Sequence, residues 1–300
     1  MVTFNPNQPF PMPGSLQQTE ETNPLKKYFR QPKMYITLPS KGQWYAAGAL
    51  DMPPTGELPV YAMTAKDELS MKTPDALLNG QATVDVIQSC VPNIKNAWSV
   101  PSVDIDTILI AIRIATYGDQ LELTTKLPKT GDERDFVVDL KSVLADLSSQ
   151  VFESKFSYNE FTFTLRPLTY KEFTENSIKT FEEQRLFKLV NDTSIPDEEK
   201  LAKFNESFRK LTSLTVNTLL TGIHSIEVAG EVVNNSNHIK EFIDNAEKDL
   251  FQSILNHLTL QKNKFAIKPF TATTSEEDQE KGAPKTFEVP ITFDQSNFFA

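Results

Sequence analysis

Few side chains of this sequence have the type and spacing that catalysis or metal binding requires. The three histidines are His224, His238 and His257, and none of them forms the i, i+4 pair that binds zinc on one helix face. Cys90 is the only cysteine, which excludes an intrachain disulfide and a zinc ribbon. It falls on an apolar helical stripe, where cysteine packs as a small hydrophobic residue. We therefore predict no metal site and no cofactor.

Acidic pairs, which hydrolases use for acid–base chemistry, occur at Asp104/Asp106 and Asp197/Glu198. Both pairs stand at expected helix starts, where carboxylates stabilise free backbone N–H groups, and we attribute them to capping. The sequence has no phosphate-binding loop, no dinucleotide glycine fingerprint and no nucleophile elbow. These features predict a protein that is not an enzyme.

A helix face rich in amides is the first candidate for a binding surface. Apolar residues spaced by seven predict a helix that begins near Pro74 and ends near Val91. Its opposite face carries amides and hydroxyls in place of the usual lysines and glutamates: Asn79, Gln81, Thr83, Asp85 and Gln88. Such groups can hydrogen-bond to another protein without the desolvation cost of charges. The face is either a partner contact or a solvated surface that happens to be rich in amides.

The end of the sequence is the second candidate surface. Phe298 and Phe299 are adjacent, and leaving each in water forgoes about 2 kcal/mol of burial. They either fold back on this chain or dock on a neighbour. We name them, with Asn79, Gln81 and Gln88, as the candidate partner-binding residues.

Charge limits the partners. The formal net charge of -10 argues against broad binding to nucleic acid or to an anionic membrane. Segment 26–33 is a local exception, because its basic and aromatic residues could grip a nucleic acid strand or an acidic protein surface. No apolar run approaches the ~20 residues that cross a bilayer, and residues 1–14 lack a signal-peptide pattern. We expect no nucleic acid partner, no stable membrane association and a reducing cytoplasm.

The 300 residues divide into four expected regions. Residues 1–24, rich in proline, predict a flexible arm. Region 25–167 predicts a mixed α/β part, with short antiparallel strands and two core helices, the second at 104–117. Region 168–270 predicts mainly helices, with a tight hairpin at 226–233, and 271–300 predicts an acidic loop and a terminal strand. The expected fold class is α+β, with a mixed N-terminal half and a mainly helical C-terminal half.

Two helices expected after residue 168 each carry apolar residues at helical spacing. Thr169 and Glu172 have the spacing of a capping box at the start of the first helix. That helix carries Phe173 and Phe181, and the second, expected over 197–223, has a longer series: Leu201, Phe204, Phe208, Leu211, Leu214 and Leu219. The spacing predicts one apolar face on each helix.

Several segments resemble a known family. They are LPSKGQWY at 38–45, the stretch 57–98 that begins ELPVYAMTAK, IEVAGEVV at 226–233 with the helix after it, and PITFDQSNFFA at 290–300. These segments are similar to baseplate hub proteins of T4-like phages with contractile tails, marine members especially, described as hub subunits or hub assembly chaperones. The resemblance covers most of residues 25–300 and carries no catalytic signature.

The resemblance implies a role in baseplate hub assembly, as a chaperone or as a structural subunit. It implies partners among the hub, spike and tape-measure proteins of the phage tail. The implied location is the host cytoplasm during assembly, or the tail baseplate of the virion. The alternative from another class is a tail-associated cell-wall hydrolase.

Overall fold

The computed structural model describes residues 24–72, 80–189 and 197–291. The chain divides into two compact units, Met1–Gln31 and Pro32–Ala300. In the first unit the described part contains the short 3₁₀ helix η1 (Pro24–Tyr28), whose residues are all exposed. Every other described element belongs to the second unit.

A first hydrophobic core of the second unit forms around α4 (Ser102–Tyr117). The sequence predicted this helix, and it is buried on most sides, since Ile108, Ile110 and Ile112 are all inaccessible to solvent. Other elements that contribute buried residues to this core include the antiparallel strands β1 (Met34–Ile36) and β2 (Leu58–Val60) and the helices α1 (Ala65–Met71), α3 (Gln81–Cys90) and α5 (Leu140–Ser149).

Helix α3 is the described part of the amide-rich helix. It begins at Gln81, because Gly80 has a φ of 79°, a left-handed conformation that ends regular helix geometry. The expected start near Pro74 lies outside the described residues. Val84, Ile87 and Cys90 are buried on the inner face, as the periodicity predicted.

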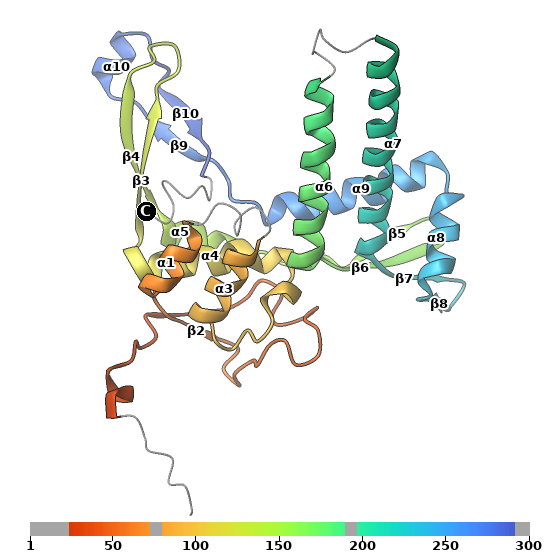
Figure 1. Cartoon of the computed structure of the whole chain (residues 1–300), viewed down its shortest axis with the longest axis horizontal. Helices are drawn as coiled ribbons and strands as arrows, with labels where there is room; N and C mark the ends of the chain where they lie inside the picture. Colours follow the sequence, from red (N-terminus) through yellow and green to blue (C-terminus); the bar gives the residue numbers. More distant parts are fainter. Residues whose placement is uncertain (1–23, 73–79, 190–196, 292–300) are drawn as a thin grey trace, which may run out of the picture. The chain divides into compact units, whose positions relative to one another are not determined.

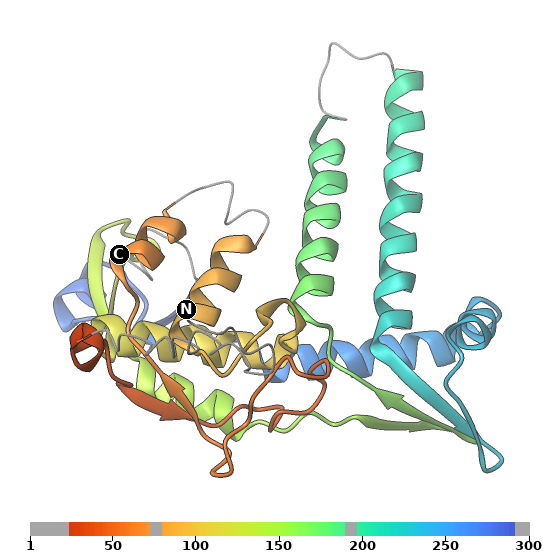
Figure 2. The ribbon, with the colours of Figure 1, turned by 60° about the horizontal axis from the view of Figure 1, so that its bottom comes forward.

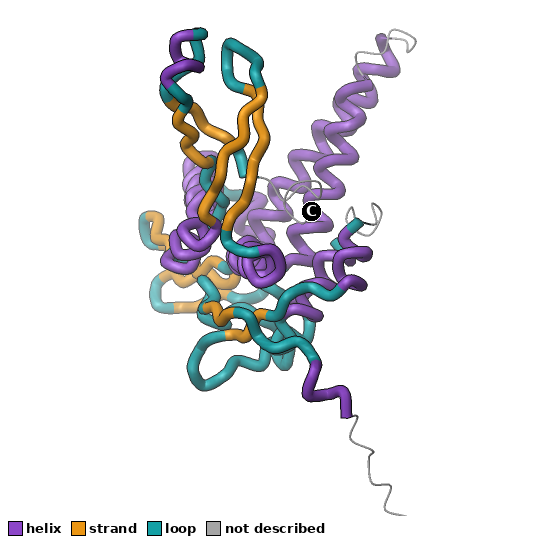
Figure 3. The backbone as a smooth tube through the Cα atoms, turned by 90° about the vertical axis from the view of Figure 1, so that its left-hand side faces the viewer, coloured by secondary structure: helices purple, strands orange, loops and turns teal. Residues whose placement is uncertain are grey.

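Two β-hairpins lie side by side at one end of this core (Figure 3). The first pairs β3 (Gln120–Lys126) with β4 (Glu133–Asp139), and the second pairs β9 (Phe270–Thr273) with β10 (Thr286–Val289). The ring of Phe136 joins them, with its centroid 6.5 Å from that of Phe270 and 5.6 Å from that of Phe287.

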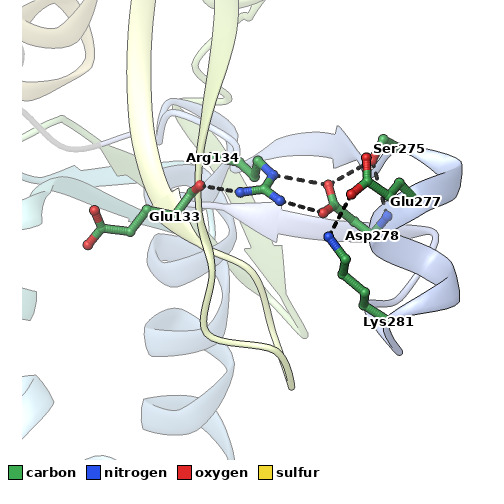
Figure 4. Close-up of polar contacts among 6 residues, drawn as sticks. All are labelled: Glu133, Arg134, Ser275, Glu277, Asp278 and Lys281. Atoms are coloured by element: carbon green, nitrogen blue, oxygen red, sulfur yellow. Dashed lines mark hydrogen bonds and ion pairs between the residues drawn. The ribbon is translucent and has the colours of Figure 1, made fainter.

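An ion pair locks the two hairpins together (Figure 4). Arg134 donates from Nη2 to Asp278 Oδ1 at 2.7 Å and from Nε to Oδ2 at 3.2 Å. Ser275 Oγ also donates to Asp278, at 2.8 Å. Asp278 lies in α10 (Glu276–Glu280), so the acidic segment that we expected to be a loop contains a helix. Hydrogen bonds from Arg134 and then Ser275 lower the pKa of Asp278.

A second core forms on an antiparallel sheet of order β5-β6-β7-β8. Its strands are β5 (Lys155–Tyr158), β6 (Phe161–Leu165), β7 (Ile223–Val228) and β8 (Glu231–Val233). The helices that contribute to this core are α8 (Ser236–Asp244), α9 (Lys248–Lys264) and the end of α7 (Asp197–Gly222).

The expectation of a mainly helical C-terminal half is wrong. The described part of that half contains β7, β8, β9 and β10, so the class is α+β with strands in both halves. The hairpin at 226–233 is confirmed, and its turn residues Ala229 and Gly230 both have positive φ. Local periodicity did not show that β7 would pair with β6, because that pairing joins Phe163 to Ile226 across 63 residues of chain.

The helices α6 (Tyr170–Leu189) and α7 lie between the strands of this sheet in sequence and form a long hairpin (Figure 1). Tyr170 belongs to the first core and stacks on Trp98, with ring centroids 5.7 Å apart. Leu219, near the end of α7, belongs to the second core. The base of the hairpin therefore joins the two cores, and both helices project away from α4 and α9 (Figure 2).

Candidate functional site: an apolar groove and an exposed helical face

An apolar groove of about 680 Å³ opens at the base of the α6–α7 hairpin. Residues of α6, α7, α9 and the start of α4 line it. Its apolar lining includes Ile105, Phe173, Phe181, Leu211, Leu258 and Phe265. Concave apolar surfaces with a few polar groups are typical of binding sites for small molecules or for protein segments.

Two acidic residues in or beside the groove have shifted pKa values. Asp106 lines it, and burial raises the pKa of that carboxyl from 3.8 to about 6. Burial also raises the pKa of Glu172, but hydrogen bonds from Arg166 and Thr169 outweigh this effect and the net pKa is lowered. Arg166 donates two hydrogen bonds to Glu172, at 2.8 and 3.0 Å.

The capping box predicted at the start of α6 is confirmed. Thr169 N donates to Glu172 Oε2 at 2.8 Å, and Glu172 N donates to Thr169 Oγ1 at 3.2 Å. The box and the Arg166 pair fix the direction in which α6 leaves the groove.

The apolar surface continues from the groove along the hairpin. Phe204 and Phe208 stand seven and three residues before Leu211, which lines the groove, so helical spacing places all three on one side of α7. Phe208 is 59% exposed and Leu201 61%. On α6, Phe181 lines the groove and is 64% exposed. We name this surface the apolar hairpin face: Phe173 and Phe181 on α6 with Leu201, Phe204, Phe208 and Leu211 on α7.

The contact between the two helices is polar in its described part. Ser207 is the only buried residue of α7 from Lys200 to Thr215. Glu183 pairs with Lys210 at 3.6 Å. Nearer the base, Asn176 Nδ2 donates to Thr218 Oγ1 at 3.1 Å. Among the described side chains of the hairpin, polar groups thus pair between the two helices, whereas Phe181, Leu201 and Phe208 are more than half exposed.

Of the candidate residues predicted from the sequence, the structure describes Gln81 and Gln88, and both lie apart from this surface. Gln81 and Gln88 lie exposed on α3 and do not line the groove. Gln81 donates to Asp85 at 2.7 Å, and Gln88 accepts from Ala97 N at 3.3 Å. Asn79, Phe298 and Phe299 lie outside the described residues. Thr83, assigned to the same polar face, is buried. The partner-binding role of these residues stays a prediction.

The attribution of Asp104 and Asp106 to helix capping is wrong. Helix α4 has no side-chain cap, and Asp104 instead accepts hydrogen bonds from residues far away in sequence. Ser40 donates from N at 2.8 Å and from Oγ at 2.5 Å, and Tyr45 Oη donates at 3.0 Å. This buried cluster holds the 38–45 segment on the core.

The histidines have aromatic and backbone neighbours. His224 lies edge-on to Trp44, with ring centroids 6.1 Å apart. His257 lies 5.0 Å from the ring of Phe156 and 3.2 Å from the carbonyl oxygen of Glu153. Within the described ranges no three His, Cys, Asp or Glu side chains gather as a metal site would require. Among the helices of those ranges, none has the length and apolarity to span a bilayer.

The sequence predicted the apolar positions of the hairpin face but did not predict that they would be exposed. Periodicity identified an apolar face on each helix, and such a face is usually covered by the same chain. The polar residues at the positions between the helices, Ser207 and Glu183, were the signal that sequence reasoning missed.

A family model described as T4 bacteriophage base plate protein matches residues 30–281. Comparison with curated proteins and with solved structures gave no match. The matched region contains the second core, the hairpin face, the groove and the first core except for its last residues, Val289 and Ile291.

Proposed function

We infer the role of this chain from the family to which it belongs, the T4 bacteriophage base plate proteins. We propose that it acts in assembly of the baseplate hub, as a chaperone or as a structural subunit. Its proposed partners are hub, spike and tape-measure proteins of the tail, bound in the host cytoplasm during assembly. Its proposed action is binding rather than catalysis.

The observation that carries this proposal is the apolar hairpin face. Phe181, Leu201 and Phe208 are each more than half exposed on one projecting element. A contiguous apolar surface of this kind is costly in water and is typical of a protein interface. The adjoining groove extends the surface towards the base of the hairpin. Both features favour a protein that works by contact with other baseplate components.

Quantitative mass spectrometry of purified virions and of infected-cell lysate tests the role. Peptides of this chain in virions, at a fixed small ratio to hub proteins, would identify a built-in subunit. Peptides in lysate that co-purify with hub proteins but are missing from virions would identify a chaperone. A chain that neither enters virions nor co-purifies with any hub protein would contradict the proposal.

Zymography tests the proposed absence of catalysis. We expect the purified protein to leave peptidoglycan intact, while lysozyme on the same gel clears it. A cleared band at 33.9 kDa, the mass of this chain, would instead support a wall hydrolase.

A further inference from the structure

We propose that the apolar hairpin face binds the same face of a second copy of this chain, so that two α6–α7 hairpins form a four-helix bundle. The inference rests on the proposed function, because it names the partner at the surface that carries that function. Three observations support it: the placement of apolar side chains, the charge of the hairpin and the size of the face.

The side chains of the hairpin are arranged as they would be in half of a bundle. A bundle buries its large apolar residues at a central seam, with spacings of three and four along each helix. Leu201, Phe204, Phe208 and Leu211 have this spacing, yet Leu201 and Phe208 are each more than half exposed. Ser207, three residues after Phe204 and four before Leu211, is buried. A second layer of helices on the apolar side would bury the side chains of Phe181, Leu201 and Phe208, which are more than half exposed.

The net charges of the chain and of the hairpin favour a second copy of this chain as the partner at the face. The chain has a net charge of -10, so two copies repel each other over most of their surfaces. Helices α6 and α7 together contain eight Lys or Arg and eight Asp or Glu, and carry no net charge. The hairpin is thus an element on which two identical chains can meet without net repulsion. A partner recognised by opposite charge would favour an element with a net charge, and α6 and α7 together have none.

The face is large enough for a stable dimer. Helix α6 has 20 residues and α7 has 26. At 1.5 Å per residue the shared length is about 30 Å, and two helices side by side are about 20 Å wide. Each copy would cover about 600 Å², or about 1,200 Å² in total, which is the lower end of the range for specific interfaces. A two-fold arrangement uses the same surface on both copies, so one face suffices.

Sedimentation velocity of the full chain over a range of concentrations tests this inference. We expect wild-type protein to sediment as a dimer of 33.9 kDa chains that dissociates on dilution. Phe208→Glu and Leu201→Glu should each raise the dimer dissociation constant about 30-fold or more, as expected for the loss of a central apolar contact. Far-UV circular dichroism should be unchanged, since both residues are exposed.

Leu260→Glu is the matched control. Leu260 lies on α9 and is 62% exposed, against 61% for Leu201, but it does not line the groove. The control should sediment like wild type. A wild-type chain that stays monomeric at all concentrations would overturn the proposal. A Leu260→Glu variant whose dimer dissociation constant rises as much as that of Phe208→Glu would also overturn it.

A cysteine introduced at the face gives an independent measurement. The native Cys90 is buried, whereas Thr215 is exposed and lines the groove. Thr215→Cys should form an intermolecular cross-link with a bifunctional thiol reagent, whose spacer bridges the distance between the two copies of residue 215, and Phe208→Glu added to it should abolish that band. An absent band in Thr215→Cys together with monomeric sedimentation would overturn the dimer. Peptides of the chain in virions would still support the baseplate role. A failure of the dimer inference is therefore distinguishable from a failure of the proposed function.

Discussion

At the scale of single residues, the sequence placed Asp104 at a helix start but did not predict its hydrogen-bond partners. Its carboxylate accepts hydrogen bonds from Ser40 and Tyr45, which precede it by 64 and 59 residues. Helix-start acids usually cap their own helix, so the local pattern favoured capping. A contact across that much chain depends on the packing of the 38–45 segment, which local rules do not describe.

Substitution of Asp104 should separate its hydrogen bonding from its charge. Asp104→Ala leaves the buried Ser40 N–H without its acceptor, and should lower the free energy of unfolding by about 2 kcal/mol. Asp104→Asn keeps an acceptor oxygen there and should cost less. Urea denaturation at neutral pH measures both. Equal stability of the alanine variant and wild type would show that the cluster does not hold the segment.

The pH dependence of stability provides a second test of Asp104. Burial raises the pKa of Asp104 from 3.8 to about 6, although hydrogen bonds from Ser40 and Tyr45 lower it. Between these pH values the native carboxyl holds a proton that the unfolded chain has released, so the contribution of Asp104 to the free energy of unfolding falls as pH rises and then levels off. Asp104→Asn should reduce this slope. Part of the slope should remain in this variant, because burial also raises the pKa of Asp106 to about 6. An unchanged slope would contradict the assignment.

At the scale of elements, the predictions were correct where the apolar periodicity was strong, and they missed the short helix α10. Helix α4 and the hairpin at 226–233 were predicted. Helix α10 was missed, because its five residues are mostly acidic and are held by tertiary contacts with Arg134. The apolar spacing of α7 predicted a face correctly, but spacing alone does not tell whether the same chain covers that face.

Removal of the Arg134 side chain should release α10. Arg134→Ala deletes both hydrogen bonds to Asp278, and we expect a several-fold faster cleavage of 276–280 by a protease specific for glutamate. Lys281→Ala is the control, because it removes only an exposed i, i+4 pair with Glu277. Similar cleavage rates in the two variants would show that the Arg134 pair does not hold α10.

At the scale of the whole second unit, the first core joins residues from nearly its full length. Ile36 lies at one end of that range and Ile291 at the other. The sequence predicted many members of this core, but it did not predict that β9 and β10 would return to β3 and β4. The groove between the two cores was likewise unpredicted, since four helices distant in sequence form it.

A single buried charge should therefore prevent folding of the unit. Ile112 is fully buried in α4, and Ile112→Asp places an unpaired carboxylate in the first core, at a cost of several kcal/mol. We expect this variant to be insoluble on expression. Val137→Asp, at a position that is 52% exposed, should remain soluble and is the control. A soluble Ile112→Asp protein with an unchanged melting curve would contradict the core assignment.

The return of β9 and β10 to the first core also sets an order of events during translation. Arg134 emerges from the ribosome 144 residues before Asp278, and Ala272, Val289 and Ile291 are added to the core later than almost all its other members. At bacterial elongation rates the nascent chain waits on the order of ten seconds for these residues. During that interval the apolar surface around Phe136 has no cover. A chain whose synthesis stops before β10 is therefore the form most exposed to aggregation and to host proteases.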